Sequence, residues 1–308
     1  MRHSHNRHCF YFLVAVATSA SFAVPSQAEE LLRWDFKADE TYEVRFHHTT
    51  ITQTSVNKVP LDVTINLSMK MTWEIDNIDA TGCAKIKQSF DHLSVSMDAP
   101  GLKTITFDSA KENQKHAAAQ SIANAAMPLI GKSIVVTLTA RGEITDVTTD
   151  DDDLPLPQTS VGQGTATNLF SKESVTQILH QSLCIFPAEK VQRGDEWTLT
   201  RVVPSPLGKL HLTTTYTYES NDIVDGSPSI RLTTSGDIKV TAATNAEKKP
   251  TRLVAQSNSG YILLDPMTKQ IKKSFVEQKL TTEKDYRDTK VDVTSQSTVR
   301  MTMTKLKG

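Results

Sequence analysis

The side chains of this sequence that could do chemistry are few, and none stands at the spacing of a known motif. His47 and His48 are adjacent in a segment that alternates like a β-strand, so their imidazoles face opposite ways and cannot chelate one ion together. His92 lies where another strand changes phase, and a β-bulge there could turn the imidazole toward a site. A solvated strand histidine is the simpler interpretation. We therefore expect no metal site and no catalytic residue among them.

Two loop segments also carry polar or glycine-rich patterns. Asp150–Asp153 could attract calcium, which prefers carboxylate oxygen, but four consecutive aspartates lack the alternating spacing that folds oxygens around an ion. Gly162 and Gly164 form a glycine pair without the strand-then-helix context of a phosphate-binding loop. Both patterns indicate a solvated linker.

Motifs of common enzyme classes are missing from the sequence. It contains no nucleophile elbow, no phosphate loop and no Cys-x-x-Cys pair. A pair of carboxylates for glycoside hydrolysis is set by separation in space, so the sequence cannot identify one. The chain has only three tryptophans with which to build a sugar-stacking platform. We expect no cofactor and no enzyme, with a hydrolase of scattered residues as the least favoured alternative.

An export signal is predicted at the N-terminus. Arg2 and Arg7 form a basic region, Cys9–Val24 is apolar and then rich in small residues, and Ala28 ends a small-x-small cleavage site. The strongly apolar part is about 9 residues long, whereas a membrane-spanning helix needs roughly 20. We expect residues 1–28 to be a signal peptide, and the mature chain to be periplasmic or extracellular with no remaining membrane span.

Charge and length limit the partners and the number of domains expected of the mature chain. Cleavage after Ala28 removes two basic residues and no acidic one, so 34 basic and 35 acidic residues become 32 and 35, a net charge of −3. This balance argues against nucleic acid as a partner. A mature length of about 280 residues suits one large β domain or two smaller packed units.

The two cysteines that remain after cleavage are a candidate disulfide. Cys83 and Cys184 would lie in an oxidising compartment, where thiols commonly pair. A bridge would close a loop of about 100 residues, which in the chain-entropy model stabilises the fold by roughly 4–5 kcal/mol. The alternative is that each cysteine is a small buried apolar residue that never meets the other.

A long β-strand gives the clearest local signal. Apolar and polar residues alternate strictly from Leu61 to Ile75, which predicts one strand with a buried face and a solvated face. A turn rich in Asp, Asn and Gly follows at Asp76–Gly82. In Cys83–Met97 the apolar residues move from even to odd positions near Asp91-His92, which predicts a β-bulge.

Two helices and a linker are predicted to interrupt the strands. An alanine-rich helix is expected at about 109–127, ended by Pro128, and an amphipathic helix at about 171–186, ended by Pro187. Between them, residues 150–170 combine an acidic run with prolines and glycines and are expected to be a linker. After the second helix the chain returns to strands that continue to its end.

The predicted fold is therefore mainly β (α+β). We expect a long antiparallel meander that forms one or two curved sheets, with the two inserted helices described above. The expected organisation is a signal peptide (1–28), an N-terminal β-meander with a helix (29–149), a linker (150–170) and a helix plus C-terminal β-meander (171–308), the two halves packed as one unit. Weak similarities between the halves leave duplication open.

Several short phrases occur in a recognisable order. They are Leu32–Lys37 with Asp39-Glu40, Asp79–Gly82 leading into Ile86–Asp91, Thr139–Val147, Phe186-Pro187 with Val191 and Arg193–Trp197, and Thr214–Glu219 ahead of Asp222–Gly226. Together they resemble an exported, β-rich family of unknown function common in planctomycete-type bacteria. The resemblance implies a shared fold and no catalytic residue, and it implies that a Cys83–Cys184 bridge would be specific to this member.

Three functional hypotheses follow. The first is a non-catalytic envelope protein that binds a lipid or another apolar or amphipathic molecule in the concavity of a curved sheet. The second is a structural or protein-interaction module of the cell envelope. The third is the hydrolase of scattered residues. An apolar cavity would favour the first, and a cleft where His92 meets carboxylates would favour the third.

Overall fold

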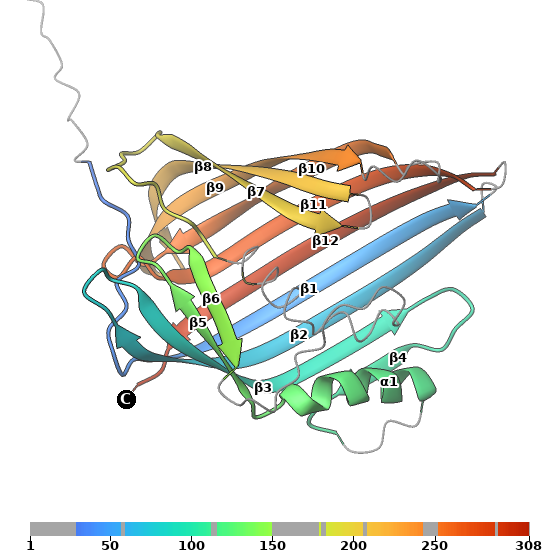
Figure 1. Ribbon diagram of the computed structural model, residues 1–308, viewed down its shortest axis with the longest axis horizontal. Helices are drawn as coiled ribbons and strands as arrows, with labels where there is room; N and C mark the ends of the chain where they lie inside the picture. Colours follow the sequence, from blue (N-terminus) through green and yellow to red (C-terminus); the bar gives the residue numbers. More distant parts are fainter. Residues whose placement is uncertain are drawn as a thin grey trace, which may run out of the picture.

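The described chain forms one antiparallel sheet of 12 strands (Figure 1). The structure is a computed structural model, and it describes residues 29–56, 59–111, 116–149, 179, 183–205, 208–242, 252–286 and 289–307. The strands are β1 (Thr41–Val56), β2 (Val59–Ile78), β3 (Ala84–Asp98), β4 (Ile105–Asp108), β5 (Ser133–Leu138), β6 (Ile144–Thr149), β7 (Glu196–Ser205), β8 (Gly208–Val224), β9 (Ser227–Ala242), β10 (Arg252–Leu264), β11 (Ile271–Tyr286) and β12 (Thr289–Lys305).

The two ends of the chain meet in the middle of this sheet. The strand order is β6-β5-β3-β2-β1-β12-β11-β10-β9-β8-β7, with β4 beside β3. Strand β1 pairs with β12 from Tyr42 opposite Lys305 to Val56 opposite Val291. The first and last strands therefore join the N-terminal and C-terminal meanders into one sheet. The prediction of a mainly β protein is confirmed, but one sheet replaces the one or two that were expected.

The prediction of two inserted helices is wrong, because the described residues contain one α-helix, α1 (Ala117–Ala126), followed by the short 3₁₀ turn Met127–Leu129. Helix α1 is shorter than the predicted span 109–127: the Nδ1 atom of His116 accepts a hydrogen bond from the Ala118 N–H at 3.2 Å and caps the helix there. Of the second predicted helix, 171–178 and 180–182 lie outside the described residues. The Leu183 N–H donates to the carbonyl of Leu179 at 2.9 Å, and Cys184–Phe186 lie in no helix or strand.

Two local predictions are confirmed on neighbouring strands. The alternating segment lies in β2, which runs for 20 residues. The register between β2 and β3 shifts between Lys70 and Met71, where Asp91 has no opposite residue, so the β-bulge falls at the predicted Asp91-His92. The phase change in the sequence therefore located a real break in the strand pairing.

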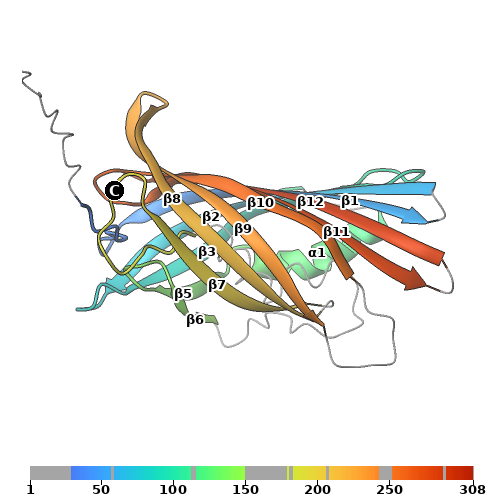
Figure 2. The same cartoon turned by 90° about the horizontal axis from the view of Figure 1, so that it is seen from above.

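The sheet is strongly curved. Figures 1 and 2 show β1, β2 and β12 at the back of a trough, whose two arms, β5–β6 and β7–β9, bend toward the viewer of Figure 1. The buried apolar side chains alternate along the strands and point into this trough, as in Tyr42, Val44 and Phe46 of β1 and Val299, Met301 and Met303 of β12. One face of the sheet is therefore concave and mostly apolar.

One end of the trough is closed by an N-terminal segment, Glu29–Glu40, which we call the strap. The Trp34 N–H donates to the carbonyl of Ala140 at 2.9 Å, beside β5, and the Asp35 N–H donates to the carbonyl of Thr268 at 3.1 Å, between β10 and β11. Glu30 exchanges two backbone hydrogen bonds with Val191, at 2.8 and 2.9 Å. The strap thus ties both arms of the sheet together at this end, which we call the closed end.

Aromatic side chains fill the space beneath the strap. The rings of Trp34 and Phe36 are stacked with centroids 5.2 Å apart, and Phe36 meets Tyr42 edge to face at 6.0 Å. Phe186 lies 6.1 Å from Trp34, and all four residues are buried. Aromatic pairs of this kind add roughly 0.5–1.5 kcal/mol each beyond the area they bury. The closed end is therefore filled by aromatic side chains in mutual contact.

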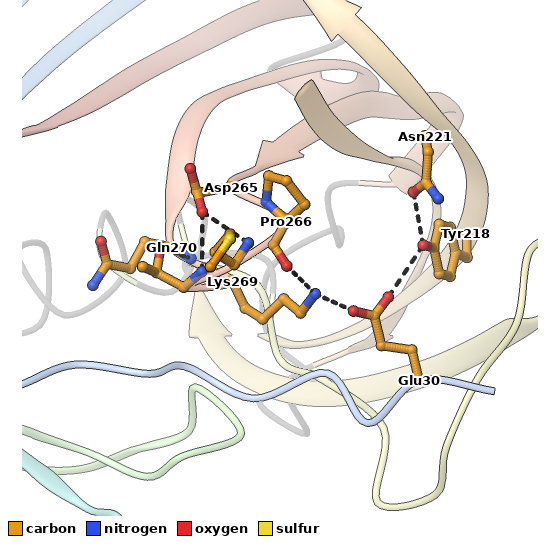
Figure 3. Close-up of polar contacts among 9 residues, drawn as sticks. Glu30, Tyr218, Asn221, Asp265, Pro266, Lys269 and Gln270 are labelled. Atoms are coloured by element: carbon orange, nitrogen blue, oxygen red, sulfur yellow. Dashed lines mark hydrogen bonds and ion pairs between the residues drawn. The ribbon is translucent and has the colours of Figure 1, made fainter. Parts of the chain in front are cut away.

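A polar network fastens the strap to the C-terminal arm (Figure 3). The Lys269 ammonium forms an ion pair with Glu30 and a hydrogen bond to the carbonyl of Pro266. The Tyr218 hydroxyl lies 3.3 Å from the Glu30 carboxylate and 2.8 Å from the Asn221 side-chain oxygen. Burial and the neighbouring Glu30 charge raise the pKa of Tyr218 to about 12, so its hydroxyl keeps its proton and can donate.

Gly142 offers a test of how tightly the closed end is packed. Its φ of 95° is in the region that favours glycine, and an added Cβ would lie 2.2 Å from the carbonyl oxygen of Cys184 and 2.6 Å from Nε1 of Trp34. We predict that Gly142→Ala lowers the free energy of unfolding by about 2–5 kcal/mol, combining backbone strain with overpacking.

The matched control is Gly101→Ala. Gly101 also has a positive φ, 75°, but an added Cβ there meets nothing within 4 Å, so we expect about 1–2 kcal/mol from strain alone. Denaturant unfolding of both variants measures the difference. Equal losses would show that the strap is not packed against Gly142.

Candidate functional site

Strand register places a row of five polar residues and one glycine across the concave face. We call this row the polar row, and its members are Thr214, Gly236, Asn258, Gln278, Ser297 and Thr50. They come in this order from β8, β9, β10, β11, β12 and β1, and each residue is paired with the next across two neighbouring strands. Next to it, toward the closed end, the same strands carry Tyr216, Val276 and Val299. The concave face therefore changes from apolar to polar along the trough.

A pocket of about 90 Å³ lies against this row on the C-terminal half of the sheet. We call it the inner pocket, and it is lined by Leu183, Arg201, Leu212, Thr214, Tyr216, Thr234, Asn258, Ile262, Val276, Gln278, Ser297 and Val299. Its lining mixes aliphatic side chains with hydroxyl and amide groups that can donate or accept hydrogen bonds. Such a lining suits a molecule with an apolar part and a polar part.

A close approach between two strands shapes the pocket wall. The Asn258 side chain lies over Gly236 on the adjacent strand, where an added Cβ would be 2.6 Å from Nδ2 of Asn258. Only glycine leaves room for the amide in that position. Because Gly236 has no side chain, the Asn258 side chain can occupy the space above it in the polar row.

Arg201 is the one charged side chain among the residues that line the inner pocket. It stands on β7 opposite Leu212 and diagonal to Thr214 of the polar row. Burial lowers the pKa of its guanidinium, but arginine stays protonated in proteins. Glu143 is the carboxylate whose charge opposes that shift, and it is paired with Arg141 at 3.4 Å. Arg201 is therefore a cationic group at the edge of the inner pocket.

A histidine and two hydroxyls meet beside the pocket. Nε2 of His48 lies 2.7 Å from Oγ of Ser297 and 3.1 Å from Oγ1 of Thr50. Burial lowers the pKa of His48, so its imidazole is neutral at pH 7. Serine beside histidine is part of a nucleophilic triad, but within the described chain no hydrogen bond joins a carboxylate to His48. The arrangement is a hydrogen-bonded polar group rather than an activated nucleophile.

A second, larger pocket of about 510 Å³ lies at the closed end. It is an open surface groove that mixes Asp225 and Asp265 with several lysines. Its lysines already serve the fold: Lys272 donates to Ser227 and Ser229, and Lys305 is paired with Glu40 at 2.5 Å. The inner pocket is smaller, but its polar groups point into the trough, so it is the better candidate site.

The structure places the histidines noted in the sequence apart from one another. His47 is exposed and its Nδ1 lies 2.9 Å from Oγ of Ser68, while His48 faces the trough. Nε2 of His92 lies 2.8 Å from Oδ1 of Asp108, and this contact lowers the pKa of Asp108 to about 2. The pair lines neither pocket described above. Asp150–Asp153 and Gly162–Gly164 lie outside the described residues.

Cys83 and Cys184 are both free thiols in this structure, half-buried and buried. They flank the same turn: a Cβ on Gly82 would lie 3.2 Å from Cβ of Ala140, and one on Gly142 would lie 2.2 Å from the Cys184 carbonyl oxygen. Burial raises the pKa of the Cys184 thiol well above its usual range. The pairing of Cys83 with Cys184 stays a prediction.

Metal and membrane signals can be assessed only within the described ranges. There, no group of three or more His, Cys, Asp or Glu side chains could hold a metal ion. No helix among those residues is long and apolar enough to cross a membrane.

Comparison with known proteins identifies the family. The model of a family of unknown function, DUF6263, matches residues 81–268, which is more than half of the chain. The chain belongs to this family. The matched range includes most of the phrases on which the sequence resemblance rested, although Leu32–Lys37 lies before it. Comparison with curated protein sequences gives no match.

Solved structures with similar folds are distant. Lipovitellin, from a study of lipid–protein interactions, has a TM-score of 0.47 and 11% identity, over 89% of this chain and 26% of that chain. A Bacteroides fragilis protein with a YmcC-like fold has a TM-score of 0.27 and 9% identity, over 85% of this chain and 96% of that chain. This chain thus spans about a quarter of the lipovitellin chain. At these scores neither likeness bears on function.

The state of the cysteines can be decided by mass. Since both flank one turn and the chain is predicted to reach an oxidising compartment, we predict a bridge in protein purified from the cell envelope. Denatured without reductant, such protein should take up no alkylating group, and after reduction it should take up two. Two modified cysteines in the unreduced sample would contradict the pairing.

The buried imidazole predicts a pH effect on stability. Because the folded-state pKa of His48 lies below the unfolded value near 6.5, the unfolded chain binds more protons as the pH falls below 6.5, and stability is lost there. We predict that His48→Gln reduces the loss of unfolding free energy between pH 7.5 and pH 5.5. Urea unfolding at both values measures it.

His47→Gln is the matched control, since it removes the neighbouring exposed imidazole from the opposite face of the same strand. It should leave the pH-dependent loss in place. The same reduction in both variants would show that burial in the trough is not the cause.

Proposed function

We propose that this protein is an exported, non-catalytic binding protein of the cell envelope that holds an amphipathic molecule against the concave face of its sheet. The inner pocket carries the proposal, because it joins aliphatic side chains to the polar row in one concave site. Ligand sites of this kind are mostly apolar, with a few placed polar groups that orient the ligand.

Export is part of the same proposal. Glu30, two residues after the predicted cleavage site, makes the first backbone contacts of the strap. Removal of residues 1–28 would therefore leave every described contact of the strap in place. A free, exported chain with a trough is suited to receive a ligand from an envelope membrane or from the surrounding fluid.

A protein-interaction module is the second candidate. Two large apolar side chains are strongly exposed at the closed end, Ile223 at 78% and Met267 at 84%. Exposed apolar groups on turns can anchor a partner protein. This candidate predicts no ligand in the trough, so one binding experiment separates the two.

Blocking the inner pocket tests the binding proposal. Thr234 lines the pocket, and Thr234→Trp would fill it with an indole ring. We predict that the wild-type protein binds a fluorescent polyene fatty acid with micromolar affinity, and that the variant weakens binding at least tenfold. Titration by fluorescence measures the affinity, and native mass spectrometry of protein from its own envelope looks for a co-purifying lipid.

Ser235→Trp is the matched control, because Ser235 is the next residue of β9, is exposed and faces away from the trough. It should bind as the wild type does. Failure of the wild type to bind any long-chain probe, together with envelope protein free of lipid, would favour the interaction module instead.

A further inference from the structure

A band of positive charge crosses the convex face of the sheet, which is turned away from the viewer of Figure 1. We call it the basic band, and it consists of two adjacent rows of residues that the strand register sets from β9 to β2. The first row is Arg231, Leu263, Lys273, Thr302, Arg45 and Lys70, and the second is Thr233, Tyr261, Phe275, Arg300, His47 and Ser68. Five of these twelve residues are lysine or arginine, and none is aspartate or glutamate. Positive charge is thus concentrated on one face of a chain whose mature form is expected to be mildly acidic.

An aromatic pair at the centre of the basic band orients two of its arginines. The rings of Tyr261 and Phe275 are stacked, with centroids 5.6 Å apart and an angle of 22° between their planes. The guanidinium carbon of Arg231 lies 4.9 Å from the centre of the Tyr261 ring, and that of Arg300 lies 5.2 Å from the centre of the Phe275 ring. A guanidinium that lies over a ring can still donate hydrogen bonds in its own plane. The aromatic contacts therefore hold both cations while leaving them N–H donors for a ligand.

Two carboxylates beside the basic band neutralise its outer parts. Glu219 is paired with Arg231 at 2.9 Å. Glu43 lies 2.7 Å from Arg45 and 2.9 Å from Lys70, so it serves both of these cations. The charge that remains for a partner is therefore concentrated between these two places.

Lys273 and Arg300 form this central part of the basic band. They stand on the adjacent strands β11 and β12, where Phe275 is opposite Arg300 and Lys273 is opposite the next residue but one, Thr302. Within the described chain no ion pair joins either cation to a carboxylate. Arg300 is exposed and Lys273 is half-buried, so both are within reach of a ligand on this face.

The length of the basic band points to an extended ligand. Neighbouring strands lie about 4.8 Å apart, so the five steps from β9 to β2 span roughly 24 Å. The cations stand at intervals along this length and do not converge on one point. A complementary ligand therefore carries repeated negative charges along a chain. Carboxylates suit it well, because their two oxygens match the planar fork of an arginine.

An acidic polysaccharide fits this surface better than a membrane does. The basic band lies on the convex side of a strongly curved sheet, so a flat bilayer would meet only part of it (Figure 2). The large apolar residues that are exposed in the described chain lie outside the band, which leaves it without a side chain to insert among lipids. A sugar chain can follow the curvature, and its hydroxyls can form hydrogen bonds with those of Thr233, Thr302 and Ser68.

We infer that the basic band binds an acidic polysaccharide, with Lys273 and Arg300 binding its carboxylates and the Tyr261–Phe275 pair orienting the arginines. The inference goes beyond the proposed function, because the band lies on the face opposite to the inner pocket. The two share only the export of the chain. A protein with both properties would stay on a polysaccharide of the envelope while its concave face remains open to a ligand.

The test compares four probes on the wild-type protein. Polygalacturonate supplies repeated carboxylates, dextran supplies neutral sugar, galacturonate supplies a single carboxylate, and phosphatidylglycerol vesicles supply an anionic membrane. We expect polygalacturonate to bind in isothermal titration calorimetry and to lose at least tenfold in affinity as the salt concentration is raised, since exposed charges are screened. Dextran and the vesicles should not bind, and galacturonate at millimolar concentration should not compete.

Variants then assign the binding to the basic band. The double variant Lys273→Gln/Arg300→Gln should weaken polygalacturonate binding about tenfold or more, because it removes two charge-assisted contacts. Phe275→Leu keeps the net charge but removes the ring beneath Arg300, and it should weaken binding about threefold.

Lys239→Gln/Lys279→Gln is the matched control. Both lysines are exposed on the convex face, on β9 and β11 and outside the basic band, so this variant loses the same charge as the first double variant. It should bind polygalacturonate within twofold of the wild type. Equal weakening in the two double variants would show that only total charge matters, and would overturn the band as a site.

The wild-type comparison can overturn the inference in three further ways. Dextran binding as tight as that of polygalacturonate would rule out recognition of carboxylates. Binding of the vesicles without binding of polygalacturonate would make the convex face a membrane contact instead. Binding of none of the four probes would leave the band without a ligand. None of these results touches the proposed function, which the fluorescent fatty acid tests on the opposite face.

Discussion

The pairing of β1 with β12 is the constraint on which the rest of the structure depends. Among the described strands it is the pairing that joins the N-terminal and C-terminal meanders, and it sets the register in which they meet. Ser297 stands opposite Thr50 and Val299 opposite His48 because of this register. A slip of one residue would turn the buried side chains of β12 to the solvated face. The place of Thr50 in the polar row and the hydrogen bond between Ser297 and His48 therefore follow from one non-local contact.

The concave face is covered differently at the closed end and farther along the trough. A concave apolar face must be covered, and at the closed end the strap covers it with Leu32, Trp34 and Phe36 while tying the two arms together by backbone hydrogen bonds. Farther along, the concave side chains become half-buried hydroxyls and amides, which need no apolar cover. Among the described residues, this change in side-chain chemistry lowers the need for apolar cover along the trough.

Local features of this fold could be predicted and non-local ones could not. The alternation in β2 and the bulge at Asp91-His92 depend only on residues close together in the sequence, and both were predicted correctly. The number of sheets depends on β1 meeting β12 from opposite ends of the chain, which no local pattern reports. Helix α1 was predicted too long, since alanine content suggested a start well before His116 caps the first turn. The polar row was missed because it is assembled from six strands. Its one trace was Ser295 and Ser297, which interrupt the apolar positions of β12.

The position of Arg201 is the strongest argument that the concave face does more than hold the sheet together. Burial disfavours its charge, as the lowered pKa shows, and an aliphatic residue at that place would continue the apolar surface of Leu199 and Leu212. Residues that conflict with local packing are found where function needs them, and here the conflict coincides with the polar row and the inner pocket. A cation, a row of hydroxyl and amide groups and an adjoining apolar wall meet in one concavity, and the proposed binding of an amphipathic molecule accounts for all three together.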